Sequence, residues 1–212
     1  MGSLCLSLME DELFRAAVKG DLRVFSDENT SNHGEAYYTD QTTPKGNTII
    51  HIAAEHGRAD FIEEALARFP ELSRSKNNNM DTPLHVAAMR GDEKIVELLA
   101  SVEGCATMEE EEEEVNWPWM ARNLQGDTPL HLALTNKKLS VVMRLLDVGS
   151  TLALSLVNAS QETPLHIFLK YCVGNHSSLD FPSPSQIKRH TGFCLFMRSE
   201  FKAQILIIRK SF

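Results

Sequence analysis

The stretch TPLHVAAMRG at residues 82–91 decides the fold, because the chain repeats it in phase. TIIHIAAEHG stands at residues 48–57, TPLHLALTNK at residues 128–137 and TPLHIFLKYC at residues 163–172. The threonines that open these copies are 34, 46 and 35 residues apart, and the motif histidines keep the same intervals. A weaker copy, LFRAAVKGD at residues 13–21, matches only the second half of the motif. Periods of this length indicate a solenoid of stacked helical units.

Each residue type in the motif has a structural reason. The threonine predicts a helix N-cap, and the proline after it suits the first helical position, where a missing N–H costs nothing. The leucine faces the core, the alanine pair allows close helix packing, and the glycine marks a left-handed C-cap. A second amphipathic stretch follows each copy, as in KIVELL at residues 94–99. The residues assigned to this structural frame are Thr48, His51, Thr82, Pro83, Leu84, His85, Thr128, Pro129, Leu130, His131, Thr163, Pro164, Leu165 and His166.

A turn and two helices in about 33 residues resemble the ankyrin repeat. The resemblance covers residues 10–172 and implies an all-α ankyrin-repeat solenoid of helix-turn-helix units joined by short turn or hairpin loops. We expect about four to five repeats, of which the first and the last are atypical. In the last copy, Phe168 and Leu169 replace the alanine pair and Cys172 replaces the glycine, so the array should end near residue 172.

Three stretches carry a finer likeness: MEDELFRAAVKGDLRVF at residues 9–25, FPEL at residues 69–72 and LVNASQETPLH at residues 156–166. They resemble plant ankyrin-repeat proteins of the accelerated-cell-death type. That family usually continues with several membrane-spanning helices, and it is associated with plant defence and salt-stress signalling. This chain departs from the family pattern, since no segment approaches the ~20 apolar residues that such a helix needs.

Three segments lie outside the repeat pattern. Residues 1–9 are interpreted as an N-terminal tail. An insert at about residues 103–116 contains six consecutive glutamates, and we expect a mobile acidic loop there because like charges resist packing. Residues 173–212 form a basic and apolar tail that we expect to be poorly ordered. A truncated or alternatively spliced end is the favoured interpretation of this tail, and a basic amphipathic helix for a membrane surface remains open.

Charge and cysteine content limit the class of partner and the compartment. The net charge is −8, but residues 177–212 carry +4, so the rest of the chain carries −12. An acidic body argues against nucleic acid as a partner, because binding phosphates needs a positive face. The four cysteines form no CxxC pair, which favours a reducing, intracellular compartment.

The sequence shows no motif that carries chemistry. It contains no GxSxG, P-loop, GxGxxG or HExxH pattern. The motif histidines have no cysteine or carboxylate at metal-ligand spacing, so hydrogen bonding between neighbouring turns is favoured over metal binding. The glutamate run lacks the spaced oxygens and central glycine of a calcium loop. We therefore expect no enzyme activity, no cofactor and no metal.

A solenoid without a reaction site offers an extended surface for other molecules. We therefore predict a non-catalytic, cytoplasmic adaptor that binds other proteins, and the family resemblance implies plant stress or defence signalling. The alternative is a signalling regulator held peripherally at the plasma membrane. Its tether would be the tail, an acyl group at Gly2 or Cys5, or a membrane-bound partner.

The resemblance also implies where a partner binds. In ankyrin-type arrays the turn tips and the exposed side of each first helix line one concave surface. The corresponding positions vary between the copies here, whereas the motif does not; simple solvent exposure is the alternative explanation of that variation. Met89 with Arg90 is the expected anchor. These positions, called the recognition face below, are Lys45, Glu55, His56, Asn78, Asn79, Met89, Arg90, Leu124, Gln125, Thr135 and Asn136.

Overall fold

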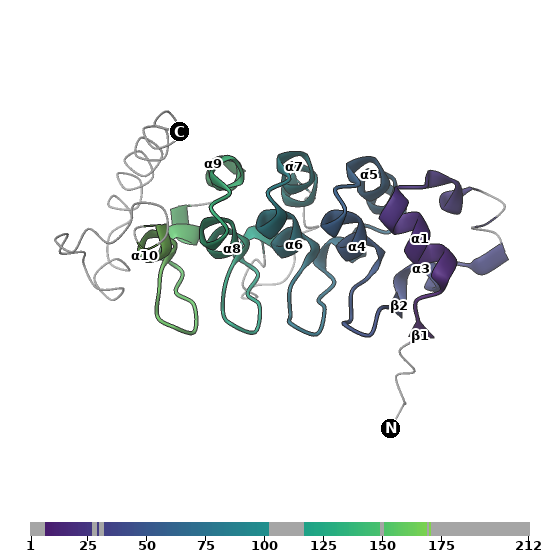
Figure 1. Ribbon diagram of the computed structural model, residues 1–212, viewed down its shortest axis with the longest axis horizontal. Helices are drawn as coiled ribbons and strands as arrows, with labels where there is room; N and C mark the ends of the chain where they lie inside the picture. The colour runs from purple at the N-terminus through teal and green to yellow at the C-terminus, as the bar shows by residue number, and fades with distance from the viewer. Residues whose placement is uncertain are drawn as a thin grey trace, which may run out of the picture.

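The structure is a computed structural model, which describes residues 7–26, 29, 32–101, 117–148, 151–168 and 170. Successive units lie side by side in a row from the N-terminal to the C-terminal end (Figure 1). The first helix of each unit packs on the first helix of the next unit, and the second helices form a parallel row above them in Figure 1. The predicted all-α ankyrin-repeat solenoid is therefore confirmed.

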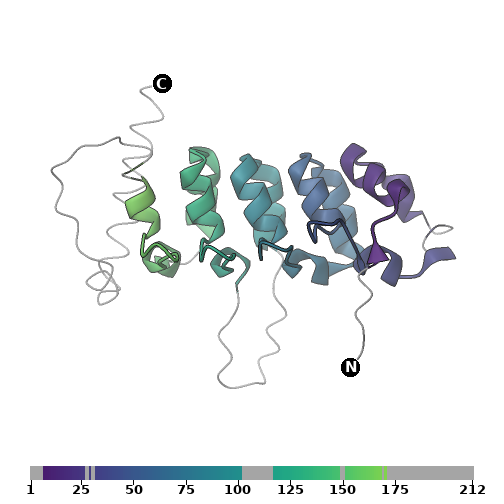
Figure 2. The same cartoon turned by 60° about the horizontal axis from the view of Figure 1, so that its bottom comes forward.

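The helices follow the sequence pattern closely. The first helices are α1 (Asp11–Lys19), α4 (Ile49–Glu55), α6 (Pro83–Arg90), α8 (Pro129–Thr135) and α10 (Pro164–Phe168). The second helices are α5 (Ala59–Arg68), α7 (Glu93–Ser101) and α9 (Leu139–Val148). Short 3₁₀ helices lie at η1 (Leu22–Phe25), η2 (Pro70–Arg74), η3 (Pro118–Met120) and η4 (Thr151–Ser155). Long hairpin turns connect the units and project from one side of the row (Figures 1 and 2).

The core runs along the whole row between the two layers of helices. Each second helix buries one apolar face, as α7 does with Ile95, Val96 and Leu99. The first helices α4, α6 and α8 are buried more completely, because each one lies between two neighbouring first helices and against its own second helix. Ala87 and Ala88 have no exposed surface, and the absence of longer side chains lets α4, α6 and α8 approach one another.

The N-terminal end contains a pairing that the sequence analysis did not predict. The strand β1 (Ser7–Leu8) pairs in parallel with β2 (Gln41–Thr42), which follows the short helix α3 (Ala36–Thr39). The backbone N–H of Met9 donates to the carbonyl of Thr42 at 2.9 Å. The sequence places residues 7–9 in the N-terminal tail, but these backbone bonds attach them to the first unit. Residues 1–6 lie outside the described part of the chain.

Backbone conformation at the hairpin turns and helix ends follows one plan. Gly46 and Gly126 adopt a positive φ in two of the turns, and Met80 and Gln161 adopt φ of 60° at the equivalent positions. Gly91 ends α6 in the left-handed region, as the sequence predicts. The turns therefore keep one geometry even where glycine is replaced, at the cost of some backbone strain.

Two expectations fall on residues outside the described ranges. These are the acidic insert at about residues 103–116 and the tail at residues 173–212. After the insert, Trp117 and Trp119 stack with ring centroids 4.8 Å apart, and Trp119 is half-buried against the core. Within the described ranges, the helices are too short or too polar to span a lipid bilayer.

Candidate protein-interaction site

A histidine and a threonine build the same network at the start of each repeated first helix. In α6 the backbone N–H of Thr82 donates to Nδ1 of His85 at 3.1 Å, while the Thr82 hydroxyl caps the first turn. Nδ1 must be unprotonated to accept that bond, so the ring proton lies on Nε2. Thr48 with His51 and Thr128 with His131 repeat this arrangement. The network fixes the start of each helix and the orientation of each ring.

The opposite edge of each ring joins one unit to the next. Nε2 of His51 donates to the carbonyl of Asp81 at 2.8 Å, and Nε2 of His85 donates to the carbonyl of Asp127 at 3.0 Å. Nε2 of His131 reaches the carbonyl of Glu162 at 3.2 Å. In each pair the acceptor belongs to the hairpin turn of the following unit. The histidine therefore sets the position of that turn.

Burial makes these histidines neutral in the folded chain. His51, His85 and His131 have no exposed surface. Burial lowers the pKa of His51 to about 4, against the opposing effect of its hydrogen bond to Asp81. Burial also lowers the pKa of His85 and of His131. A neutral ring suits the bonding pattern, because Nδ1 accepts while Nε2 donates.

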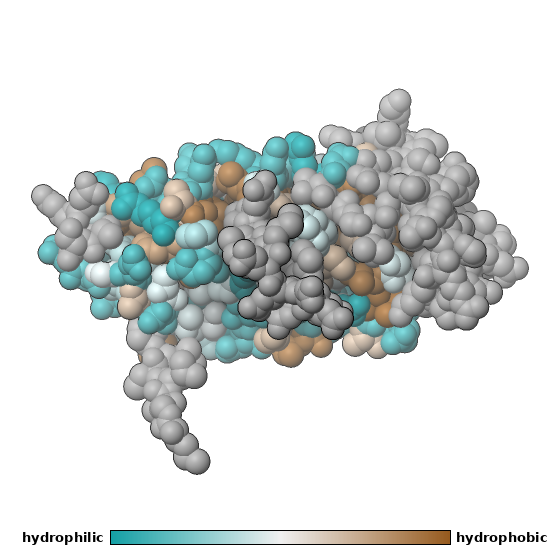
Figure 3. Space-filling model, turned by 180° about the vertical axis from the view of Figure 1, so that it is seen from behind, coloured by the Kyte–Doolittle hydropathy of each residue, from teal (hydrophilic) through white to brown (hydrophobic). Residues whose placement is uncertain are grey.

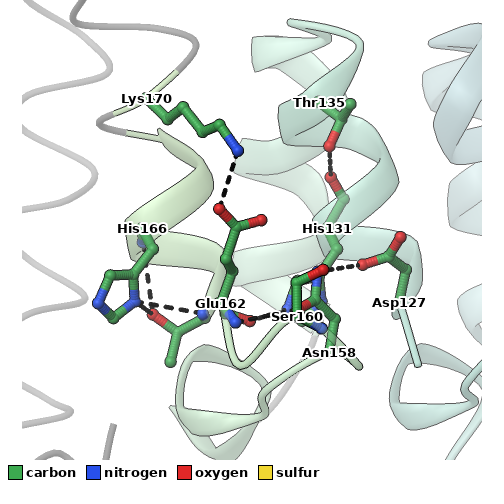
Figure 4. A network of polar contacts seen from close by, with 9 residues as sticks. Asp127, His131, Thr135, Asn158, Ser160, Glu162, His166 and Lys170 are labelled. Atoms are coloured by element: carbon green, nitrogen blue, oxygen red, sulfur yellow. Dashed lines mark hydrogen bonds and ion pairs between the residues drawn. The ribbon is translucent and has the colours of Figure 1, made fainter. Parts of the chain in front are cut away.

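The turns of neighbouring units also bond directly to one another. The backbone N–H of Asn78 donates to the carbonyl of Lys45, and that of Leu124 donates to the carbonyl of Asn79, at 3.0 and 2.9 Å. Side chains add a parallel row of bonds, such as Asn158 Nδ2 to Asp127 Oδ1 at 2.8 Å (Figure 4). The tips are therefore held in register mainly through their backbones, and the Asn78 side chain adds a bond to the carbonyl of Pro44 at 3.1 Å.

All eleven residues of the recognition face are exposed. Among them, Leu124 is 62% exposed and Met89 is 43% exposed, so the face includes two large apolar side chains that a partner could cover. Hydrophobic residues are visible at the lower edge in Figure 3, which is the edge formed by the turns in Figure 1. The frame residues behave in the opposite way, since every one is buried except the half-buried Leu165 and His166.

At the N-terminal end, the helix part and the tip part of the recognition face border one groove. This groove is lined both by Lys45 of a tip and by Glu55 and His56 of α4. A smaller hollow of about 210 Å³ brings His56 and Arg90 together across two neighbouring units. Thr135 and Asn136 are less free, because each side chain bonds to a carbonyl within α8.

Sequence reasoning missed two residues at the end of this surface. Leu8 is 69% exposed and Phe14 is 40% exposed, and both line the same groove as Lys45. A signal for Phe14 was present, because LFRAA aligns with LHVAA and places a phenylalanine at the motif histidine. Leu8 had no comparable signal, since its position depends on the unpredicted pairing of β1 with β2.

Metal binding finds no support in the part of the chain that the structure describes. No group of three histidine, cysteine, aspartate or glutamate side chains there could hold an ion. The buried histidine nitrogens are instead engaged with backbone groups and threonine hydroxyls.

Comparison with known proteins agrees with this architecture. The family profile "Ankyrin repeats (3 copies)" matches residues 13–111, and the profile "Ankyrin repeat" matches residues 125–155. Protein ACCELERATED CELL DEATH 6 of Arabidopsis thaliana is 34% identical over 121 residues, which are 56% of this chain and 16% of that protein. The Target of rapamycin complex 2 subunit AVO2 of Saccharomyces cerevisiae is 27% identical over 134 residues, which are 63% of this chain and 28% of that protein.

A third relative, the Transient receptor potential cation channel subfamily A member 1 homolog of Caenorhabditis elegans, is 33% identical over 86 residues, or 41% of this chain and 6% of that protein. The matched region thus spans less than a third of each of these three relatives. The repeats are what they share with this chain. From the profiles and the repeated geometry together, the chain belongs to the ankyrin-repeat family, whose repeats mediate binding to other proteins.

Proposed function

We propose that this protein is a non-catalytic adaptor that binds a partner protein across its recognition face. The observation that carries this proposal is that the frame residues are buried or half-buried, whereas the recognition-face residues are exposed. The frame residues satisfy their hydrogen bonds with one another and with backbone carbonyls of the next turn, whereas the recognition face is exposed throughout. Side chains at the tips can therefore differ from unit to unit with little cost to the fold, which is what recognition of a particular partner requires.

Met89 and Arg90 at the end of α6 are the proposed anchor of this face. Both are exposed, and they occupy the central unit, with described units on either side. Methionine adapts its shape to irregular apolar surfaces, and arginine is enriched among residues that dominate binding energy. Arg90 also lines the hollow that it shares with His56, so a partner side chain could contact two units at once.

The proposed setting is plant stress or defence signalling in the cytoplasm. Its support is the similarity to the Arabidopsis protein, whose name refers to accelerated cell death. Because that match covers 16% of the relative, the similarity concerns the repeats and the pathway is our inference from it.

Affinity purification from the native tissue tests the adaptor function. The full chain serves as bait, and Met89→Ala with Arg90→Ala is the test variant. We expect partner recovery to fall by the equivalent of more than ~1 kcal/mol, which is the scale of a binding hot spot. The melting midpoint should stay unchanged, because both side chains are exposed. Glu63→Ala, an exposed position on α5, is the control and should recover the partner normally.

One outcome would place the binding site outside the recognition face. If the double variant keeps its partner, but a chain without residues 177–212 loses it, the recognition face is not the binding site. If the Glu63→Ala control loses the partner while its melting midpoint is unchanged, the assay responds to any change of the surface.

A second candidate function is a regulator held at the plasma membrane. The observation that favours it is the sequence after residue 177, where basic residues are interleaved with phenylalanine, leucine and isoleucine. Such residues can attach a protein to an anionic membrane surface. Fractionation separates the two proposals, because a membrane pool that resists high salt would favour the tether, and its absence would favour the adaptor alone.

A further inference from the structure

The first junction of the array lacks the histidine that the other junctions use. Phe14 occupies the motif position on α1 that His51 occupies on α4. The carbonyls of Asp81 and Asp127 each accept one backbone N–H and one histidine Nε2–H. Their counterpart, the carbonyl of Asn47, accepts only the backbone N–H of Thr43 among the described residues. This junction therefore retains spare capacity to accept a hydrogen bond.

A groove of about 550 Å³ lies at this junction. Leu8, Phe14 and Ile52 contribute apolar lining, and Asn47 lies in the same wall. Asp11 of α1 and Glu55 of α4 add carboxylates from the two helices that flank it. The groove thus combines a half-exposed aromatic ring with several hydrogen-bond acceptors.

The carboxylates of the groove are largely free to bind a cation. Glu55 has no ion-pair partner within the described ranges, and Asp11 reaches Arg15 only at 4.0 Å, with both side chains mostly exposed. Glu10 and Glu12 are the chain neighbours of Asp11. Burial of Tyr37 is the largest cause that raises its pKa to about 12, and the negative charges of Glu10 and Glu12 raise it further. The positive charge of Lys45 opposes the negative charge of these carboxylates, but Lys45 lies on the exposed turn tip rather than on either helix.

We propose that this groove receives an arginine side chain of the partner protein, flanked by apolar residues. The proposal rests on the proposed function, because the groove continues the recognition face through Lys45, Glu55 and His56. A guanidinium group can stack on the ring of Phe14 and direct its N–H groups to the carboxylates and the Asn47 carbonyl. A lysine would supply a point charge without the planar stacking surface. The acidic charge of the groove selects against an acidic partner segment.

Two short peptides test the side-chain chemistry on the full chain. The probe is the acetylated and amidated pentapeptide Gly-Leu-Arg-Leu-Gly, and its control carries citrulline, which has nearly the same shape without charge. Binding is followed by backbone amide shifts in a ¹H–¹⁵N spectrum. We expect saturable shifts around Phe14, Ile52 and Glu55, with the citrulline peptide at least about fivefold weaker, because charge-assisted bonds are lost.

Two substitutions that remove charges of opposite sign distinguish a loss of recognition from damage to the structure. Glu55→Gln should weaken the arginine peptide severalfold, whereas Lys45→Ala should strengthen it, because the first removes an attracting charge and the second a repelling one. Both positions are exposed, so the melting midpoint should not change in either variant. Phe14→His should lower peptide affinity and raise the midpoint, because the new ring can donate to the Asn47 carbonyl and compete for it.

The results would distinguish this inference from the proposed function. Equal binding of the two peptides, shifts at another place, or equal effects of Glu55→Gln and Lys45→Ala would overturn the arginine groove. No binding to the full chain would overturn it as well, including the case in which its own basic residues already fill the groove. If partner capture still depends on Met89 and Arg90 in those cases, the adaptor function stands without the groove.

Discussion

The internal junctions of the array and its first junction are built on different principles. Between α4, α6 and α8, neighbouring units repeat the same polar contacts, in which a histidine ring bonds to the next turn and the turns bond to each other. Between α1 and α4 the histidine is replaced by Phe14, and no equivalent bond reaches Asn47 from within the described residues. Among the described first helices, α6 contacts one on each side, whereas α1 contacts only α4.

The N-terminal end compensates with aromatic packing. Phe25 lies 4.8 Å from Phe61 between ring centroids, and Tyr38 stacks on Phe69 at 5.1 Å. The Tyr38 hydroxyl donates to the carbonyl of Val24 at 2.8 Å, which satisfies the polar end of a fully buried side chain. The internal units thus repeat one set of contacts, whereas the N-terminal end uses contacts that occur once.

Removing an aromatic ring from the end should have the largest effect on stability. Phe25→Ala should lower the free energy of unfolding by about 3–5 kcal/mol, because a buried ring leaves a large cavity. Leu84→Ala in the middle of the array should cost about 2–5 kcal/mol for the same reason. Urea denaturation measures both losses.

Amide hydrogen exchange would show which helices lose stability in Phe25→Ala and in Leu84→Ala. Stability in a solenoid is a sum of unit and neighbour terms, so damage at the end should expose α1 while α8 stays protected. Damage at Leu84 should expose helices on both sides of α6. Uniform loss of protection in Phe25→Ala would mean that the array unfolds as one unit and that the end is not a separate element.

Acid should weaken the internal junctions selectively. The pKa of His51 is about 4 in the folded chain and 6.5 in its unperturbed state, so the unfolded chain binds more protons between these values. Stability is therefore full above pH 6.5 and declines as the pH falls toward 4, by on the order of 3 kcal/mol for this histidine. The pKa values of His85 and His131 are lowered too, so both add to the decline.

Unfolding free energies measured from pH 7 to pH 4.5 would test this slope. His56→Gln is the matched control, because His56 is exposed and takes no part in the junction bonds described above; its profile should follow the wild type. A flat profile over this range would show that the junction histidines do not resist protonation, contrary to their burial.

The hairpin turns offer a smaller contrast between two equivalent positions. A Cβ added at Gly46 would lie 2.9 Å from the backbone nitrogen of Asn78, at a φ of 75°. Gly46→Ala should therefore cost about 1–3 kcal/mol, the range for strained backbone. Met80 already carries a side chain at φ 60°, so Met80→Ala should change the melting midpoint little. Similar losses at both positions would mean that the next turn does not restrict Gly46 more than Met80.

The sequence was sufficient to predict the frame, because each of its residues acts locally and recurs. Thr82, Pro83 and His85 begin a helix within one turn of each other, so spacing alone reveals them. The exposure of the recognition face follows from the same register. Whether those residues bind a partner stays a prediction, since exposure is necessary for recognition and does not establish it.

The features that escaped prediction depend on contacts between distant segments. Ser7 and Leu8 have no strand signal of their own, and they pair with Gln41 and Thr42 only because the first unit brings them together. The bond from His85 to Asp127 also spans the acidic insert, so its partner could not be read from a fixed spacing. The groove at Phe14 depends on three features that only the structure brings together: the phenylalanine in place of the histidine, the Asn47 carbonyl that lacks a histidine partner, and the chain before α1.

The smallest expected effect concerns the acidic insert between the motif copies at residues 82–91 and 128–137. Deleting Glu109–Glu114 should leave the melting midpoint nearly unchanged, because closing a long surface loop depends only weakly on its length. The internal bond from His85 to Asp127 joins units on either side of the insert, so the junction has its own attachment. Replacing the six glutamates with serines is the matched control, since it removes the charge and keeps the length. A loss of more than about 1 kcal/mol in the deletion alone would show that the junction needs the length of the insert. The same loss in both variants would show that the glutamates make stabilising contacts. The insert would then resemble the N-terminal end, which depends on its own particular residues, rather than the repeated frame.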